Sequence, residues 1–105
     1  MNNRQKKLNM LGLANRARNL ISGDEFVSDA IKKKKVHVVI CANDASQATK
    51  ERYEALCQRE NIPLDLTFDK YEISQSIGKS RTLCAIANQG MAKRFLSYDE
   101  DLRQE

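Results

Sequence analysis

At the centre of the sequence stands the stretch VHVVICANDAS, which covers residues 36–46. Its first part, residues 36–41, is almost continuously apolar and β-branched, which is typical of a strand that is buried on both faces. The polar residues after it open a helix, for which we expect Asp44 to be the N-cap and Gln47 its capping-box partner. A buried strand that leads directly into a helix indicates an α/β layer fold.

Helix and strand patterns alternate on both sides of this stretch. Apolar residues at helical spacing predict a first helix from about Arg4 to Leu20, and a short strand is expected at residues 20–22. Further helices are expected to begin near Ser22, at Asp69 and after Asn88, with strands over residues 64–68 and 83–87. Because strands joined by helices tend to run parallel, we predict a three-layer α/β/α sandwich with a small, mostly parallel or mixed sheet.

A few residue types predict the ends and faces of these helices. Ser22 with Glu25, and Asp69 with Glu72, have the spacing of capping boxes, and Gly78 suits a helix C-terminus. On the first helix, four charged side chains are expected to point away from the core: Arg4, Lys7, Arg16 and Arg18.

The chain has 105 residues, which suits one domain. We expect a single domain over residues 1–98 and a frayed acidic tail over residues 99–105. The inner faces of the predicted elements supply the expected core: Leu11, Ala14, Ile31, Val38, Ile40, Leu56, Leu66, Leu83, Ala85, Ile86 and Phe95.

Charge and cysteine content limit the classes of function. The formal net charge of +4 favours an anionic partner such as nucleic acid, without demonstrating one. The three cysteines are odd in number and form no Cys/His cluster, so we expect neither disulfides nor a metal, and reduced thiols fit a cytoplasmic protein. No apolar run approaches the roughly 18 residues of a membrane span, so no membrane association is expected.

The sequence contains no clear arrangement of catalytic residues. The single histidine, His37, falls inside a strand pattern, and no serine or cysteine triad can be completed without it. The four glycines are isolated, so no nucleotide-binding glycine loop is present, and Asp44 and Asp69 are accounted for as helix caps. We therefore expect that the protein is not an enzyme and uses no cofactor.

Three features could contact a nucleic acid, and each also has a purely structural interpretation. Gly23 precedes a helix, where free N–H groups can meet a phosphate or a base edge, but glycine also simply suits a turn. Lys32 and Lys33 belong to a basic run that could contact phosphates or complement the helix dipole. The loop of Lys79, Ser80 and Arg81 offers a guanidinium fork for phosphate or guanine, or is only a solvated loop.

The order of several segments resembles one superfamily. The segments are Ser22-Gly23 before an amphipathic helix, residues 39–46 as strand into helix, Asn61-Ile62-Pro63, and residues 77–81. Together they are similar to the kink-turn-binding ribosomal proteins of the L-seven-Ae and L-thirty-e type, over about residues 8–96. The opening residues 11–18, LGLANRAR, look like the small bacterial members of that family.

The resemblance implies an α/β/α sandwich that binds bent RNA. It places Gly23, Asp24, Glu25 and Phe26 against sheared G·A pairs, and the loop of Lys79, Ser80 and Arg81 over bulged nucleotides. The resemblance also places Lys70 and Arg81 at basic positions with which the family contacts that RNA. It places Ser46 and Lys50 where the family contacts a flipped base.

The chain departs from the family pattern at the start of the second helix. The pattern is commonly Gly-x-Asn-Glu-x-x-Lys, whereas residues 23–29 here read GDEFVSD. Glu25 can still accept from a guanine amino group, Phe26 cannot hydrogen-bond a base edge, and Asp29 reverses the charge of the lysine. We therefore expect weakened or altered RNA selectivity.

These patterns favour an RNA-binding, ribosome-associated protein that recognises kink-turn-like RNA, acts in translation as part of a ribonucleoprotein, and is a monomer. Structured RNA, above all ribosomal RNA, is the expected partner. The alternative is a protein-interaction module that keeps the fold with weak or lost RNA binding. An electropositive face around Gly23 favours the first, and a neutral or acidic face with an exposed apolar patch favours the second.

Overall fold

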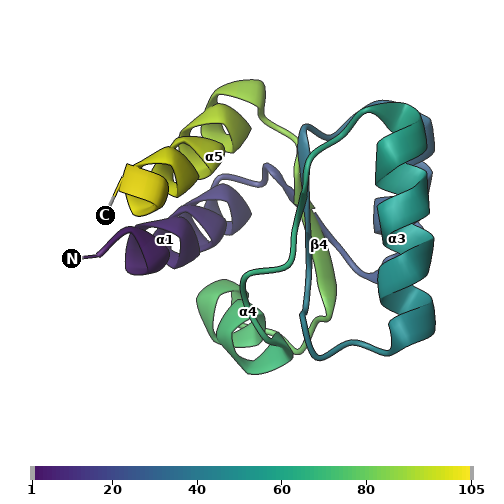
Figure 1. Cartoon of the computed structure of the whole chain (residues 1–105), viewed down its shortest axis with the longest axis horizontal. Coiled ribbons are helices and arrows are strands. Elements are labelled where there is room, and N and C mark those ends of the chain that lie inside the picture. The colour runs from purple at the N-terminus through teal and green to yellow at the C-terminus, as the bar shows by residue number, and fades with distance from the viewer. Residues whose placement is uncertain (1, 105) are drawn as a thin grey trace.

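A computed structural model describes the backbone of residues 2–104 and the side chains of residues 2–99 (Figure 1). In chain order the elements are α1 (Asn3–Arg16), β1 (Leu20–Ser22), α2 (Asp24–Lys32), β2 (Val38–Cys41), α3 (Gln47–Glu60), β3 (Leu64–Asp65), α4 (Lys70–Ile77), β4 (Leu83–Ile86) and α5 (Gln89–Gln104). This order confirms the predicted alternation, although α1 ends before Leu20 and β3 stops before Leu66.

The sheet is mixed, with the strand order β1-β4-β2-β3. Strand β4 runs antiparallel to both β1 and β2, and only β2 and β3 are parallel. The expectation of a small mixed sheet is confirmed, but the expectation of largely parallel strands is wrong. The reason is that the chain from β3 to β4 stays at the carboxyl end of β2, where Asn43 N–H donates to Phe68 O and Ala42 N–H donates to Thr82 O.

Helices cover both faces of the sheet. Figure 1 shows α1, α4 and α5 on one side and α3 on the other, and α2 packs with α3. One buried cluster lies under α1, α4 and α5, around Leu11 and Phe95, and the second lies under α2 and α3, around Ile31 and Leu56. All predicted core residues are buried except Leu66, which is partly exposed because it follows the last residue of the edge strand β3.

Two predicted helix starts are confirmed and two are wrong. Asp69 and Glu72 form the capping box of α4, and Asn88 Oδ1 accepts from Met91 N–H at the start of α5. Ser22 does not cap α2, because it lies in β1 opposite Cys84. Asp44 does not cap α3 either, since Ser46 accepts from Thr49 N–H and the Asp44 carboxylate accepts from Lys70 N–H instead.

Lys7 is the largest correction to the sequence prediction, because its side chain is fully buried rather than exposed. Its ammonium pairs with the buried carboxylate of Asp65 and, at 2.6 Å, with Asp99, and it lies 4.4 Å from the centre of the Phe95 ring. A cation is tolerated in a core only when it is paired in this way.

The C-terminal segment begins within a helix. Helix α5 continues through Asp99 to Gln104, and Glu105 lies outside the described residues. The predicted fraying of residues 99–105 stays a prediction. No helix among the described residues is long and apolar enough to cross a membrane.

Candidate nucleic-acid interface

Segments that are far apart in the sequence meet at one end of the sheet. Gly23 N–H donates to Leu83 O at 2.9 Å, which places the start of α2 beside the loop of residues 79–82. Ala42 N–H donates to Thr82 O at 2.9 Å, which brings residues 43–46 and the start of α3 to the same end. The structure therefore gathers most of the residues that the resemblance implicates into one region.

The start of α2 is shaped by Gly23. Its φ of 97° lies in a region that favours glycine, and no side chain caps the helix that follows. Free N–H groups at a helix start carry a partial positive charge and bind anions readily. Phe26 is 71% exposed beside this turn, so its ring is available to a ligand.

Asp24 is committed to contacts within the protein. Its carboxylate accepts from Arg52 at 2.6 Å and from the hydroxyl of the buried Tyr53 at 2.5 Å. The hydrogen bonds from Arg52 and then from Tyr53 hold the pKa of Asp24 below its ordinary value, and the bond to Asp24 raises the pKa of Arg52. This cluster joins the first turn of α2 to α3 and offsets the negative charge of Asp24.

We predict that Asp24→Asn lowers stability at neutral pH more than in acid. The folded pKa of Asp24 lies below its unfolded value, so the stabilisation is complete above the unfolded pKa and is lost as pH falls through the folded pKa. The side chains of the pair are about half exposed, so the loss near pH 7 should be below about 1 kcal/mol. Urea unfolding of both proteins at about pH 7 and about pH 2.5 checks this, and a difference independent of pH would contradict it.

The loop before β4 contains two exposed residues and one residue whose backbone is held by a hydrogen bond. Lys79 and Ser80 are exposed, whereas the backbone of Arg81 is held by the Ser74 hydroxyl, which accepts from its N–H at 3.0 Å. The guanidinium of Arg81 donates to Ser80 O at 2.7 Å. A guanidinium has five N–H donors, so others can bind a ligand. An arginine on a fixed backbone is well placed to bind a phosphate or a guanine.

Ser46 and Lys50 have structural partners. The Ser46 hydroxyl caps α3, and the Lys50 ammonium donates to Asn43 O at 3.1 Å. Both contacts fix the turn between β2 and α3, so these side chains have structural roles in the candidate interface.

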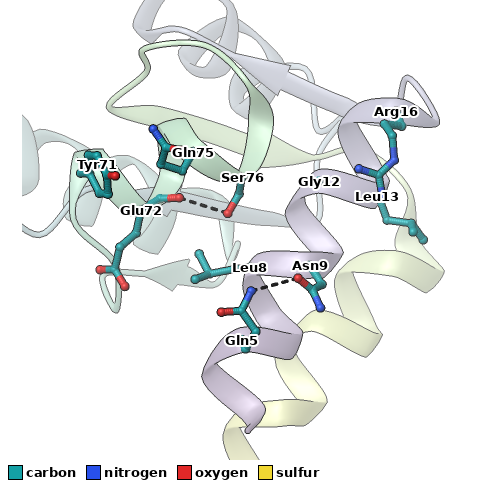
Figure 2. Close-up of a pocket in the computed structure, with 10 residues that line it drawn as sticks. All are labelled: Gln5, Leu8, Asn9, Gly12, Leu13, Arg16, Tyr71, Glu72, Gln75 and Ser76. Carbon is teal, nitrogen blue, oxygen red and sulfur yellow. Dashed lines mark hydrogen bonds between the residues drawn. The ribbon is translucent and has the colours of Figure 1, made fainter. Parts of the chain in front are cut away.

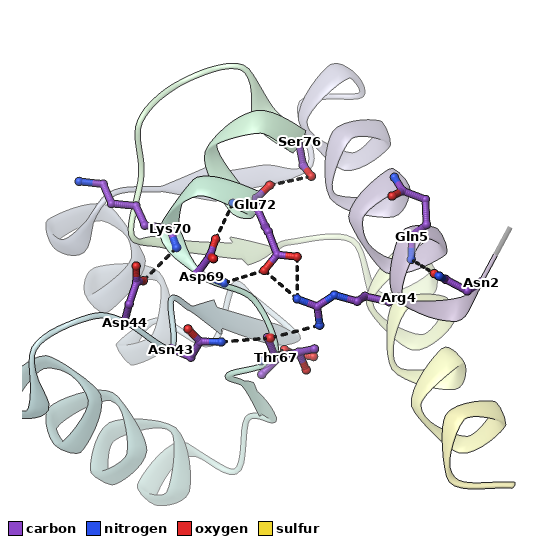
Figure 3. A network of polar contacts seen from close by, with 11 residues as sticks. Asn2, Arg4, Gln5, Asn43, Asp44, Thr67, Asp69, Lys70, Glu72 and Ser76 are labelled. Carbon is purple, nitrogen blue, oxygen red and sulfur yellow. Dashed lines mark hydrogen bonds and ion pairs between the residues drawn. The ribbon is translucent and has the colours of Figure 1, made fainter. Parts of the chain in front are cut away.

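A polar network steadies the α4 side of the interface (Figure 3). Arg4 donates to both carboxylate oxygens of Glu72, at 2.7 and 2.6 Å, and ties α1 to the first turn of α4. The Asp44 carboxylate accepts from Lys70 N–H at 3.0 Å, which joins the β2–α3 turn to the same helix. Lys70 itself is left with an exposed side chain.

Lys32 and Lys33 are not brought to this region. They lie at the other end of α2, about 12 Å along the helix from Asp24. Lys33 pairs with Asp29 at 3.0 Å, and both side chains are more than half exposed.

Arg52, Tyr53 and Arg4 are the residues that sequence reasoning missed. Arg52 is 28 residues from its partner Asp24, and Arg4 is 68 residues from Glu72. No local pattern links residues at such separations, so only the three-dimensional arrangement reveals them.

Another hollow lies elsewhere, between α1 and α4 (Figure 2). It is an open hollow with a volume of about 700 Å³. A Cβ on Gly12 would come within 2.9 Å of Ser76 O, so glycine permits the close approach of the two helices. Its acidic residue, Glu72, is paired with Arg4.

Cys41, Cys57 and Cys84 are buried free thiols. Burial raises the pKa of Cys57 to about 11 and that of Cys84 to about 12, and it also raises the pKa of Cys41. These thiols therefore stay protonated at neutral pH. Among the residues that the structure describes, no three His, Cys, Asp or Glu side chains group as metal ligands.

Comparison with known proteins identifies the family. Residues 5–95 match the family described as the ribosomal protein L7Ae/L30e/S12e/Gadd45 family. The chain belongs to this family. This confirms the resemblance that the sequence motifs indicated.

Two relatives within the L7Ae/L30e family are named as RNA-binding proteins. The chain is 40% identical over 92 residues to the RNA-binding protein YlxQ of Enterococcus faecium, covering 88% of this chain and 89% of that protein. It is 33% identical over 89 residues to YlxQ of Bacillus subtilis, covering 84% and 89%.

Solved structures show the same fold. A protein of unknown function from Bacillus halodurans matches with a TM-score of 0.86 and 30% identity over 90% of this chain and 97% of that one. The Giardia lamblia 15.5kD RNA binding protein matches with a TM-score of 0.78 over 95% of this chain and 89% of that one, at 15% identity, and so supports the fold alone.

Proposed function

We propose that this L7Ae/L30e-family protein is an RNA-binding protein that recognises kink-turn-like RNA in association with the ribosome. The observation that carries the proposal is the convergence of the uncapped start of α2 with the basic loop at Arg81, through the bond from Gly23 N–H to Leu83 O. The names of the YlxQ relatives support RNA as the partner, and the family resemblance supports a bent ribosomal RNA.

In this proposal the protein reads the shape of the RNA. Backbone N–H groups after Gly23 meet the bent part of the RNA, where the chain can approach closely because glycine has no side chain. Arg81, Lys79 and Lys70 supply cations from the neighbouring loop and helix, and such contacts position the RNA without reading its sequence. The protein binds as a monomer and performs no covalent chemistry.

We predict that Arg81→Ala weakens binding to kink-turn RNA by about 1–3 kcal/mol, because a bidentate arginine contact is lost. The affinity of the parent protein should also fall steeply with salt, since phosphates are bound. A gel shift with a kink-turn RNA and with its straightened mutant, run at two salt concentrations, measures both effects.

Lys93→Gln on α5 serves as the control, since Lys93 is exposed on the helix layer across the sheet from α2. It should leave the affinity nearly unchanged. Equal binding of the kinked and straightened RNA would reject kink recognition, and an affinity insensitive to Arg81→Ala would remove that loop from the interface.

A further inference from the structure

We propose that the groove between α2 and α3 binds the sugar–phosphate backbone of one of the stems that flank the bent RNA. This inference rests on the proposed function and extends the interface beyond the sheet end. The groove has a volume of about 330 Å³ and is lined by Ser28, Lys32, Arg52, Ala55, Leu56 and Arg59.

Helical spacing places the two arginines of the groove on one face of α3. Arg52, Ala55, Leu56 and Arg59 are separated by three, four and seven residues, so they share one face of α3. The two arginines are therefore about 10 Å apart along the helix axis. Lys32 faces them from the last turn of α2, so three cations border one hollow.

No acidic side chain lines this groove among the described residues. The acidic residues Glu51 and Glu54 of α3 fall outside the stripe of Arg52 and Arg59. Arg59 does contact Glu60, at 3.4 Å, but its own side chain is 64% exposed. Asp24 and Glu60, the partners of the two arginines, offset two of the three positive charges, so the groove keeps a net charge of +1 that a phosphate complements.

The groove is continuous with the interface at the sheet end. Arg52 lines the groove and also binds Asp24, the residue next to Gly23. A nucleic-acid strand that leaves the start of α2 therefore passes Arg52 first and then reaches Arg59 and Lys32. This path gives Lys32, which lies about 12 Å from Asp24, a role in the same complex.

The lining favours a phosphate backbone over a protein partner. Protein interfaces are centred on apolar and aromatic anchors. Among the described residues the exposed large apolar side chains are Leu13, Phe26 and Tyr71, and none of them lines this groove. Leu56 is largely buried at its floor, and the accessible groups are the three cations, the hydroxyl of Ser28 and the small side chain of Ala55.

The test uses a kink-turn RNA in three forms: one with both stems extended by a full helical turn, and two in which one stem or the other is cut back to the pairs beside the kink. Binding is measured for the parent protein, for Arg59→Gln and for Lys32→Gln, over a series of salt concentrations. These variants spare Arg52, so the contact with Asp24 stays intact. Arg59→Lys keeps the charge, and Lys93→Gln on α5 is the control.

We expect Arg59→Gln and Lys32→Gln each to weaken binding of the long RNA by about three- to tenfold and to reduce the slope of log affinity against log salt by about 0.7–0.9. The loss should vanish when one particular stem is cut back, because the phosphates that the groove contacts are then missing. Arg59→Lys should retain most of the affinity, and Lys93→Gln should retain all of it.

An equal loss on all three RNAs, or no loss on any, would overturn the groove assignment while leaving the parent's binding of kinked RNA intact. Unchanged RNA binding by both variants is also the result expected if the groove serves an acidic protein instead. If the parent protein binds none of the three RNAs, the proposed function itself fails, and this inference fails with it. Circular dichroism of each variant verifies that a loss of binding is not a loss of fold.

Discussion

Replacement of Lys7 by methionine is expected to lower the free energy of unfolding by about 3–5 kcal/mol. The change leaves the carboxylate of Asp65, whose side chain is only 4% exposed, as an unpaired charge in the core. Asp99 also loses its partner, but it is partly exposed and can be hydrated. The loss would be a large part of the 5–15 kcal/mol that stabilises most domains, and urea unfolding at neutral pH measures it.

Two variants show whether the lost ion pair is the cause. Lys6→Met removes the same charge from an exposed neighbouring position and should change stability by less than about 0.5 kcal/mol. The double change Lys7→Met with Asp65→Asn removes both charges, and the new amide oxygen could still accept from Thr67 N–H as the carboxylate does, so much of the loss should be recovered. A loss from Lys7→Met no greater than that from Lys6→Met would contradict the buried pair.

Kink-turn affinity is expected to rise by about 10- to 100-fold in the triple variant Glu25→Asn, Phe26→Glu, Asp29→Lys, because contacts with base edges are worth about 1–3 kcal/mol each. The variant restores the family pattern after Gly23. Glu25 loses a negative charge, Phe26 gains one and Asp29 reverses sign, so the net charge rises by two. The salt dependence should become steeper as well.

The structure makes this variant a fair test. All three side chains are exposed at the start and outer face of α2, so their replacement opens no cavity in the core. Asp29→Lys does sacrifice the pair with Lys33, at a cost of a few tenths of a kcal/mol. Titration of a labelled kink-turn RNA measures the affinity of the parent and of the variant.

Glu51→Lys is the matched control, because it also raises the net charge by two but lies on an exposed face of α3. It should improve the affinity far less than the triple variant. If the triple variant binds kink-turn RNA no better than the parent, then Glu25, Phe26 and Asp29 belong to a different recognition surface.

Local sequence patterns determined the element order and much of the core. The apolar run at residues 36–41 predicted the central strand β2, and the spacing of Asp69 and Glu72 predicted the capping box of α4. These features depend on residues a few positions apart, whose geometry is dictated by the backbone itself. The same kind of pattern located Gly23 and the loop at Arg81 as parts of a candidate interface.

Tertiary structure alone decided which distant groups became partners. Lys7 shares the inner face of α1 with Met10, Leu11 and Ala14, and only its charge suggested an exposed position. Asp65 and Asp99, which come from elsewhere in the chain, make its burial possible. Likewise, Asp44 satisfies the N–H of Lys70 rather than capping α3, and Asp24 binds Arg52 across two helices. A side chain's hydrogen-bonding partner depends on what the folded chain places next to it, and for these residues the partner lies beyond the reach of any local pattern.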